Sequence, residues 1–155
     1  MPKLKKKPKV KWQGLKPNPS KFFGFIYEIC NTVTGTKYIG KKQYHMLNPK
    51  RSRRRPVCDT TGDWNPDHWK ASDWETYTGS CRELNADVAK LGHDKFTFHI
   101  IGQYSTKGDL SYAEVEAIIK KDAMIKRGEE GLREYYNGNV SAIRFIPPNK
   151  TKEIL

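Results

Sequence analysis

The chain has 155 residues, enough for one domain that buries about two-thirds of the surface its unfolded form would expose. Its formal net charge of +12 favours a polyanionic partner, chiefly nucleic acid. No apolar run reaches the roughly 18 residues of a membrane span, and no signal-peptide stretch opens the chain, so no membrane partner is expected. Three cysteines without C-x-x-C spacing fit a reducing compartment, and the expected location is the cytoplasm.

Residues 1–21 hold eight lysines and no acidic residue. Such a segment cannot bury enough apolar surface to fold alone, and its composition predicts a disordered N-terminal arm. The arm could be a solubilising tail or could lie along phosphates, and the overall charge favours the second reading. Residues 22–155 are expected to form a single domain.

Two strands are predicted after the arm. Residues 22–29, "FFGFIYEI", alternate and place Tyr27 on one face with the apolar residues two positions before and after it. Residues 37–42, "KYIGKK", form the return strand, where a period of two puts Tyr38 and Lys42 on the same side.

Residues 43–73 break this periodicity and contain the basic run "PKRSRRRP". A loop of this length inside a compact domain is usually functional or unstructured. Trp64 and Trp69 inside it, and Trp74 just beyond, could stack on bases or pack the insertion against the domain; the sequence leaves both open.

The second half of the chain predicts a helix over residues 80–92, a strand over 95–104 and a helix over 111–128. A Ser80–Glu83 capping box starts the first helix and Gly92 ends it. Together the elements predict an α/β (α+β) fold: a small, mainly antiparallel, three-stranded sheet flanked by helices, with the long basic insertion after the second strand.

Phe25-Ile26-Tyr27, ten intervening residues and Tyr38-Ile39-Gly40 resemble the two-part signature of the GIY-YIG nucleases, with Phe at the first glycine position. The blocks at 72–101, at 110–115 ("LSYAEV") and at 135–139 ("YYNGN") are similar to those of small phage-encoded endonucleases of the SegE-like type. The resemblance spans roughly residues 22–145.

This resemblance implies hydrolysis of a phosphodiester bond in double-stranded DNA with one divalent metal, Mg²⁺ or Mn²⁺, and no small-molecule cofactor. Glu114 is then the metal ligand. One of Tyr27 and Tyr38 takes or passes on the proton of the attacking water, and the other steadies the phosphate. A free tyrosine titrates near 10, so a base role needs nearby cations that favour the phenolate.

Each of these residues also has a structural interpretation. Tyr27 and Tyr38 could be a packed pair in the core. Ser111 and Glu114 form a capping-box pattern of their own. Glu116 is the other candidate ligand, but it lies about 200° around the helix from Glu114, so the two are not expected to share a metal. The resemblance favours Glu114.

Many family members carry an arginine two turns into the helix after the second motif, where this chain has Asp87 and Val88. Lys42 is the first candidate for the missing cation because it shares a face with Tyr38, and Arg82 and the basic cluster at residues 51–55 are reserves. The residues expected to contact DNA are Gly40, Lys41, Ser80, Asn137 and the basic cluster of the insertion, Arg51, Arg53, Arg54 and Arg55. The resulting hypothesis is a metal-dependent DNA endonuclease; the alternative is a DNA-binding protein that keeps the scaffold without cleaving.

Overall fold

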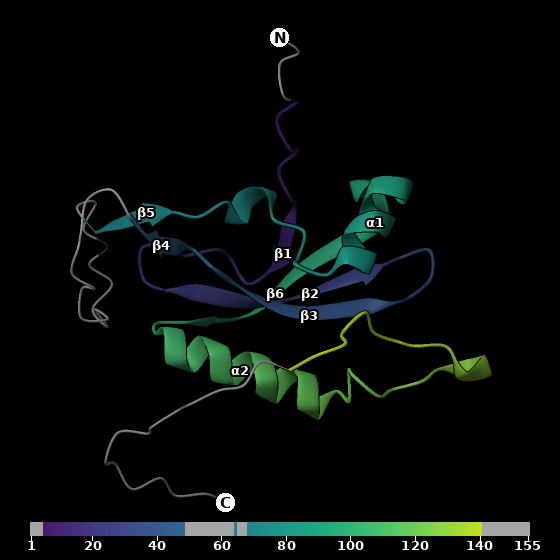
Figure 1. Ribbon diagram of the computed structural model, residues 1–155. Helices are drawn as coiled ribbons and strands as arrows, with labels where there is room; N and C mark the ends of the chain where they lie inside the picture. Colours follow the sequence, from purple (N-terminus) through teal and green to yellow (C-terminus); the bar gives the residue numbers. More distant parts are fainter. Residues whose placement is uncertain (1–4, 49–63, 65–67, 141–155) are drawn as a thin grey trace, which may run out of the picture.

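The computed structural model describes residues 5–48, 64 and 68–140. Its centre is a mixed four-stranded sheet in the order β1-β6-β2-β3 (Figure 1). The four strands are β1 (Trp12–Gly14), β2 (Gly24–Asn31), β3 (Lys37–Gln43) and β6 (Phe96–Tyr104). Strand β1 runs parallel to β6, and the other neighbours are antiparallel. The prediction of three antiparallel strands was therefore wrong by one strand, while the three predicted strands are present.

The additional strand lies within the segment expected to lack regular structure. Val10 is buried, and the Trp12 indole donates to the carbonyl of Trp74 at 3.2 Å. The Trp12 ring packs edge-on against Phe25 at 5.0 Å between ring centroids. The segment expected to be disordered therefore contains a short strand at residues 12–14, because Trp12 and Val10 supply apolar anchors among the lysines.

The two helices cover opposite faces of the sheet (Figure 1). Helix α1 (Arg82–Leu91) packs Leu84 and Val88 against the face that carries Phe25, Tyr27 and Ile29. Helix α2 (Lys107–Lys120) packs against the other face through its buried residues, Leu110 and Ile118, which join Ile26 and Ile39. The predicted alternation of β2 is confirmed, and the sheet separates two apolar clusters.

Both helices begin elsewhere than predicted. No side chain caps α1, whose N-cap is Cys81, so the Ser80–Glu83 capping box is absent; the predicted end at Gly92 is confirmed. Helix α2 begins at Lys107, where the Thr106 side chain accepts a hydrogen bond from the Asp109 amide at 3.1 Å. It ends at Lys120 rather than at Gly128, shortly before Asp122 takes a φ of 50°.

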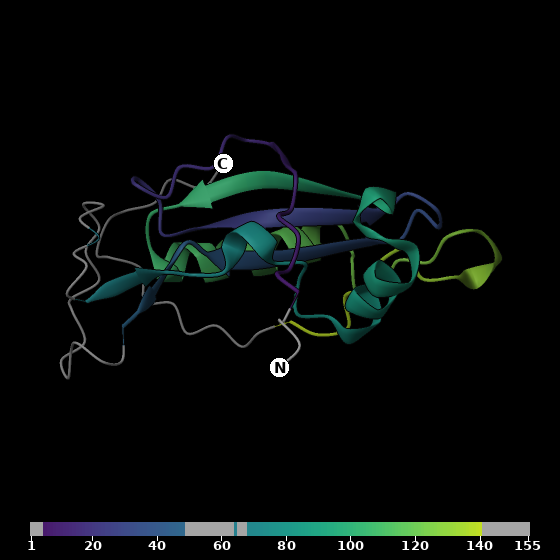
Figure 2. The ribbon, with the colours of Figure 1, turned by 90° about the horizontal axis from the view of Figure 1, so that it is seen from above.

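The insertion is described only at its two ends. There β4 (His45–Leu47) pairs with β5 (Trp69–Ala71), beyond one end of the main sheet and away from α1 (Figure 2). Trp64 and Trp69 both pack on Phe23, with ring centroids 5.8 and 6.1 Å away, which favours the packing interpretation of these tryptophans. The basic cluster Arg51, Arg53, Arg54 and Arg55 lies outside the described residues.

Three short 3₁₀ turns complete the described elements: η1 (Trp74–Thr76), η2 (His93–Lys95) and η3 (Glu129–Gly131). Neither they nor the two α-helices, over the residues that the structure describes, combine the length and apolarity needed to span a bilayer.

Candidate active site

A hollow of about 250 Å³ opens beside β3, the last strand of the sheet. Because β3 is an edge strand, side chains from both of its faces reach this hollow. Tyr38 and Lys41 come from β3 itself and Glu114 from α2. The remaining polar side chains of the lining come from two connecting segments and are those of Tyr77, Ser80, Asn137 and Asn139.

Tyr27 and Tyr38 lie side by side on neighbouring strands, with ring centroids 6.1 Å apart. Tyr27 is 1% exposed, and its residue pairs across the ladder with Gly40. A Cβ atom at Gly40 would overlap the Tyr27 hydroxyl and lie 2.9 Å from a Tyr38 ring carbon. The structure thus gives an internal reason for this glycine: its missing side chain makes room for Tyr27.

The two tyrosines differ in access to solvent. Burial raises the pKa of Tyr27 well above its usual value, and a hydrogen bond with Tyr77 adds to the effect. Tyr38 is partly exposed, and its hydroxyl lies 3.3 Å from the Ser80 hydroxyl. Burial raises the pKa of Tyr38 too, although the Ser80 hydrogen bond lowers it. Both tyrosines are therefore neutral phenols at pH 7 in this state, and Tyr38 is the one that faces the hollow.

Glu114 lies in the hollow together with Lys41. The Lys41 ammonium is 3.4 Å from a Glu114 carboxylate oxygen and donates to the Ser111 hydroxyl at 3.0 Å. The Glu114 side chain is only 13% exposed. Glu116 points elsewhere and pairs with Lys120 on the exposed side of α2. Of the two candidate ligands, the structure brings only Glu114 to the tyrosines.

Lys42 and Arg82 do not line the hollow. The Lys42 ammonium lies 2.6 Å from an Asp73 carboxylate oxygen and 4.0 Å from the centroid of the Tyr77 ring. This pairing lowers the pKa of Asp73. Arg82 is exposed in the first turn of α1. Lys42 does share a face with Tyr38, as predicted, but Tyr77 stands between it and the hollow.

Asn137 holds the edge strand in place. Its side-chain oxygen accepts from the Ile39 amide at 3.0 Å, and its side-chain nitrogen donates to the Ile39 carbonyl at 2.8 Å. Asn137 is 4% exposed and Ile39 is fully buried. The amide that was expected to contact DNA is thus already engaged by the strand that carries Tyr38 and Gly40.

Two residues near the site were missed in the sequence. Tyr77 packs edge-on against Tyr27 at 6.1 Å between centroids, and its place before Gly79 and Ser80 was the only available signal. Arg133 donates to the carbonyls of Tyr136 and Asn137 at 3.2 and 2.9 Å, an interaction without any local pattern.

Asp87, at the helix position of the absent family arginine, has a structural partner. It accepts a hydrogen bond from the Tyr136 hydroxyl at 2.6 Å, and that hydroxyl accepts one from the buried Asn31 side chain at 3.0 Å. This position therefore joins α1 to the end of β2.

The donors present fit a magnesium-like ion that is completed by substrate. Mg²⁺ prefers oxygen ligands and is commonly bound through one or two carboxylates, substrate phosphates and waters. Glu114 supplies one carboxylate at an open hollow. Among the described residues no group of three or more His, Cys, Asp or Glu side chains could form an all-protein cage.

The chain was compared with known families and proteins. The family model described as "Putative endonuclease segE, GIY-YIG domain" matches residues 9–140. This match covers the four-stranded sheet, both helices and the segment that carries Asn137. No curated protein and no solved structure gives a significant match.

Proposed function

This chain belongs to the SegE-type GIY-YIG family, and from that premise we propose that it is a divalent-metal-dependent endonuclease acting on double-stranded DNA. The observation that carries the proposal is the meeting of Tyr38 and Glu114 in one hollow, with Tyr27 directly behind Tyr38. Tyr38 and Glu114 are far apart in sequence: Tyr38 lies on the face of the sheet that packs against α1, whereas Glu114 belongs to α2 on the other face.

The chain's own groups have distinct roles in this proposal. Tyr38 offers a hydroxyl to the hollow, where it contacts the attacking water or a phosphate oxygen. Tyr27 is too buried to touch substrate and acts as a positioning residue that fixes the Tyr38 ring and the close approach of Gly40. Lys41 brings a positive charge to the hollow, where it pairs with Glu114. A phosphate that enters the hollow would give Lys41 a second anionic partner.

Glu114 is the residue that would hold the metal. A bound divalent cation would stabilise the negative charge that develops on the phosphate and favour ionisation of a nearby water or phenol. Before binding, Lys41 neutralises the Glu114 carboxylate, which is otherwise costly to keep as a charge at low exposure. Lys42, on the far side of Tyr77, is placed for a neighbouring phosphate rather than for the one in the hollow.

One observation favours the alternative of a protein that binds DNA without cutting it. The Lys41–Glu114 ion pair satisfies the carboxylate internally, and burial keeps both tyrosines protonated. A scaffold that had lost catalysis could retain this arrangement for stability alone.

Cleavage of supercoiled plasmid, with Mg²⁺ or with excess chelator, separates the two functions. The wild-type protein should convert plasmid to nicked or linear forms only with the metal. Glu114→Gln should lower the cleavage rate by at least about 100-fold, since it removes the carboxylate that would hold the metal while preserving shape. Glu116→Gln is the matched control on the same helix and should cut at the wild-type rate.

Fluorescence anisotropy with a labelled duplex measures binding in parallel. Binding by Glu114→Gln should stay close to that of the wild type. Wild-type protein that binds DNA but leaves plasmid intact with Mg²⁺ and with Mn²⁺ would establish the non-cleaving alternative.

A further inference from the structure

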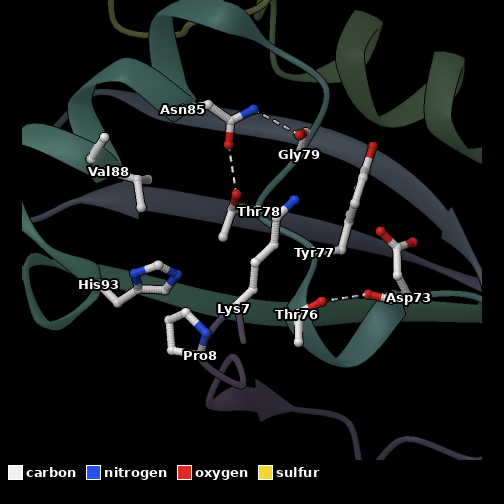
Figure 3. A pocket seen from close by; sticks show the side chains of 11 residues that line it. Lys7, Pro8, Asp73, Thr76, Tyr77, Thr78, Gly79, Asn85, Val88 and His93 are labelled. Atoms are coloured by element: carbon white, nitrogen blue, oxygen red, sulfur yellow. Dashed lines mark hydrogen bonds between the residues drawn. The ribbon is translucent and has the colours of Figure 1, made fainter. Parts of the chain in front are cut away.

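A second hollow, of about 400 Å³, lies next to the candidate active site (Figure 3). One wall is the N-terminal segment at Lys7 and Pro8, and the opposite wall is α1 at Val88 and Ala89. The chain from residue 73 to residue 79 lies between them. The volume falls within the range of roughly 300–1,000 Å³ that is usual for small-molecule sites.

The two hollows share one side chain in their linings. Tyr77 lines both of them. Gly79, which lines the second hollow, would place a Cβ atom 3.3 Å from the Tyr38 ring and 3.5 Å from the Tyr27 hydroxyl. A polynucleotide with one phosphate at Glu114 could therefore place the adjacent nucleotide on the other side of Tyr77.

The walls combine apolar surface with charged and polar groups. Thr78 donates to the Asn85 side chain at 2.6 Å, and Asn85 donates to the Gly79 carbonyl at 2.9 Å, so these polar groups partly satisfy one another (Figure 3). Val88, Ala89, Pro8 and the Tyr77 ring supply the apolar surface. Lys7 supplies a positive charge to the lining, and Asp73, which is paired with Lys42, supplies a negative one.

A more basic hollow on the other side of the molecule has a weaker claim. It is lined by Lys37, Lys120, Lys121 and Lys126 and measures about 540 Å³. Three of these lysines form ion pairs with Glu116, Glu28 and Glu134. Its positive charge is largely matched from within the protein, and its lining includes none of Tyr27, Tyr38 and Tyr77.

We infer that the hollow between the N-terminal segment and α1 is a nucleotide subsite: it receives the sugar and base next to the scissile phosphate, with Lys7 on the following phosphate. This inference rests on the proposed function. Apolar and aromatic walls suit a sugar and a base, while a lysine at the rim suits a phosphate. The N-terminal segment thereby becomes part of the DNA site rather than a detached tail.

Two alanines of α1 provide a matched test. Ala89 lines the hollow, and Ala86, one turn earlier, does not; both are exposed. Ala89→Trp should fill the hollow and weaken binding of a labelled 30-base-pair duplex by about tenfold or more. Ala86→Trp makes the same change to helix propensity and should bind within about twofold of the wild type. Thermal unfolding of both variants should coincide, so that a loss of fold is not mistaken for a blocked subsite.

Lys7→Ala distinguishes the phosphate contact from the apolar contact. It should reduce the slope of log affinity against log salt by about 0.9, the value for one lost phosphate contact on duplex DNA. Ala89→Trp should lower affinity without changing that slope. If the Ala89 and Ala86 variants bind alike, or if Lys7→Ala leaves the slope unchanged, the subsite is wrong.

These binding measurements do not depend on cleavage. If the wild-type protein fails to cut plasmid while Ala89→Trp still weakens DNA binding, the endonuclease proposal is overturned and the subsite stands. A wild-type protein that cuts plasmid while both tryptophan variants bind equally would keep the endonuclease and overturn the subsite.

Discussion

Asn137 offers the sharpest test of how the site is built. Asn137→Ala removes one acceptor and one donor, and it leaves the Ile39 amide and carbonyl without these partners. Ile39 is fully buried, so water cannot readily replace them. A buried polar group left unsatisfied costs about 1–3 kcal/mol, which gives a loss of about 2–6 kcal/mol for the pair. Domains of this size have about 5–15 kcal/mol of stability in total, so the loss should be large.

Urea denaturation followed by circular dichroism measures this loss. With a slope of about 1–3 kcal/mol/M, the midpoint should fall by about 1 M or more. Asn137→Asp keeps an acceptor for the Ile39 amide but places a buried carboxylate oxygen against the Ile39 carbonyl, so it should destabilise the fold at least as much as Asn137→Ala. Asn139→Ala, at an exposed position two residues later, is the control and should change stability by less than about 0.5 kcal/mol. Equal midpoints for the Asn137 and Asn139 alanine variants would refute the view that Asn137 holds β3.

Three further predictions concern Gly40, the N-terminal segment and two buried tyrosines. Gly40→Ala should destabilise the fold by about 1–3 kcal/mol and slow cleavage, because the added Cβ atom overlaps the Tyr27 hydroxyl. Gly138→Ala is the control and should be tolerated, because its added Cβ atom has its nearest neighbour at 3.9 Å. Calorimetry measures the stability of the two variants, and a plasmid assay measures their cleavage. Deleting residues 1–8 removes four lysines but keeps Val10 and Trp12, so it should flatten the salt dependence of DNA binding with little change in melting temperature. Deleting residues 1–21 also removes β1 and should unfold much of the domain. Equal decreases in melting temperature for the two deletions would contradict this role of β1. The free energy of unfolding should fall as pH rises above about 10. Burial raises the pKa values of Tyr44 and Tyr136 to about 12, so both keep their protons in the folded state while the same groups in the unfolded chain lose them. Urea midpoints that stay constant from pH 9 to pH 11 would show that this linkage is absent.

The strands were readable from sequence because their patterns are local. Alternation in β2 and β3 reports which side chains face a core, and the register then places Tyr27 opposite Gly40. Strand β1 is different: it has three residues, no period to detect, and a partner in β6 more than eighty positions away. Only the tryptophan and valine among the lysines indicated that this segment could pack.

Both capping boxes failed for a reason that bears on the site. Ser80 and Ser111 each precede a glutamate by three residues, but each hydroxyl has another partner in the structure. Ser80 lies against Tyr38, and Ser111 accepts from Lys41. Neither serine is the N-cap residue: Cys81 stands at the N-cap of α1, and Ser111 lies inside α2, which Thr106 caps. The consequence for Glu114 is that it remains in the hollow instead of closing a helix terminus.

Lys41 and Lys42 show where sequence reasoning reached its limit. A period of two correctly puts them on opposite faces of β3, and the choice of Lys42 as the phosphate cation followed from its shared face with Tyr38. That inference assumed that a shared face means a shared site. At this edge strand, a residue on the other face reaches the hollow instead. Lys41 extends around the outer edge of β3 to Glu114, while Lys42 pairs with Asp73 and lies over the Tyr77 ring. Because the hollow wraps around the strand, the neighbours of Tyr38 within it are set by α2 and by the segment from Asp73 to Ser80, which no local pattern places there.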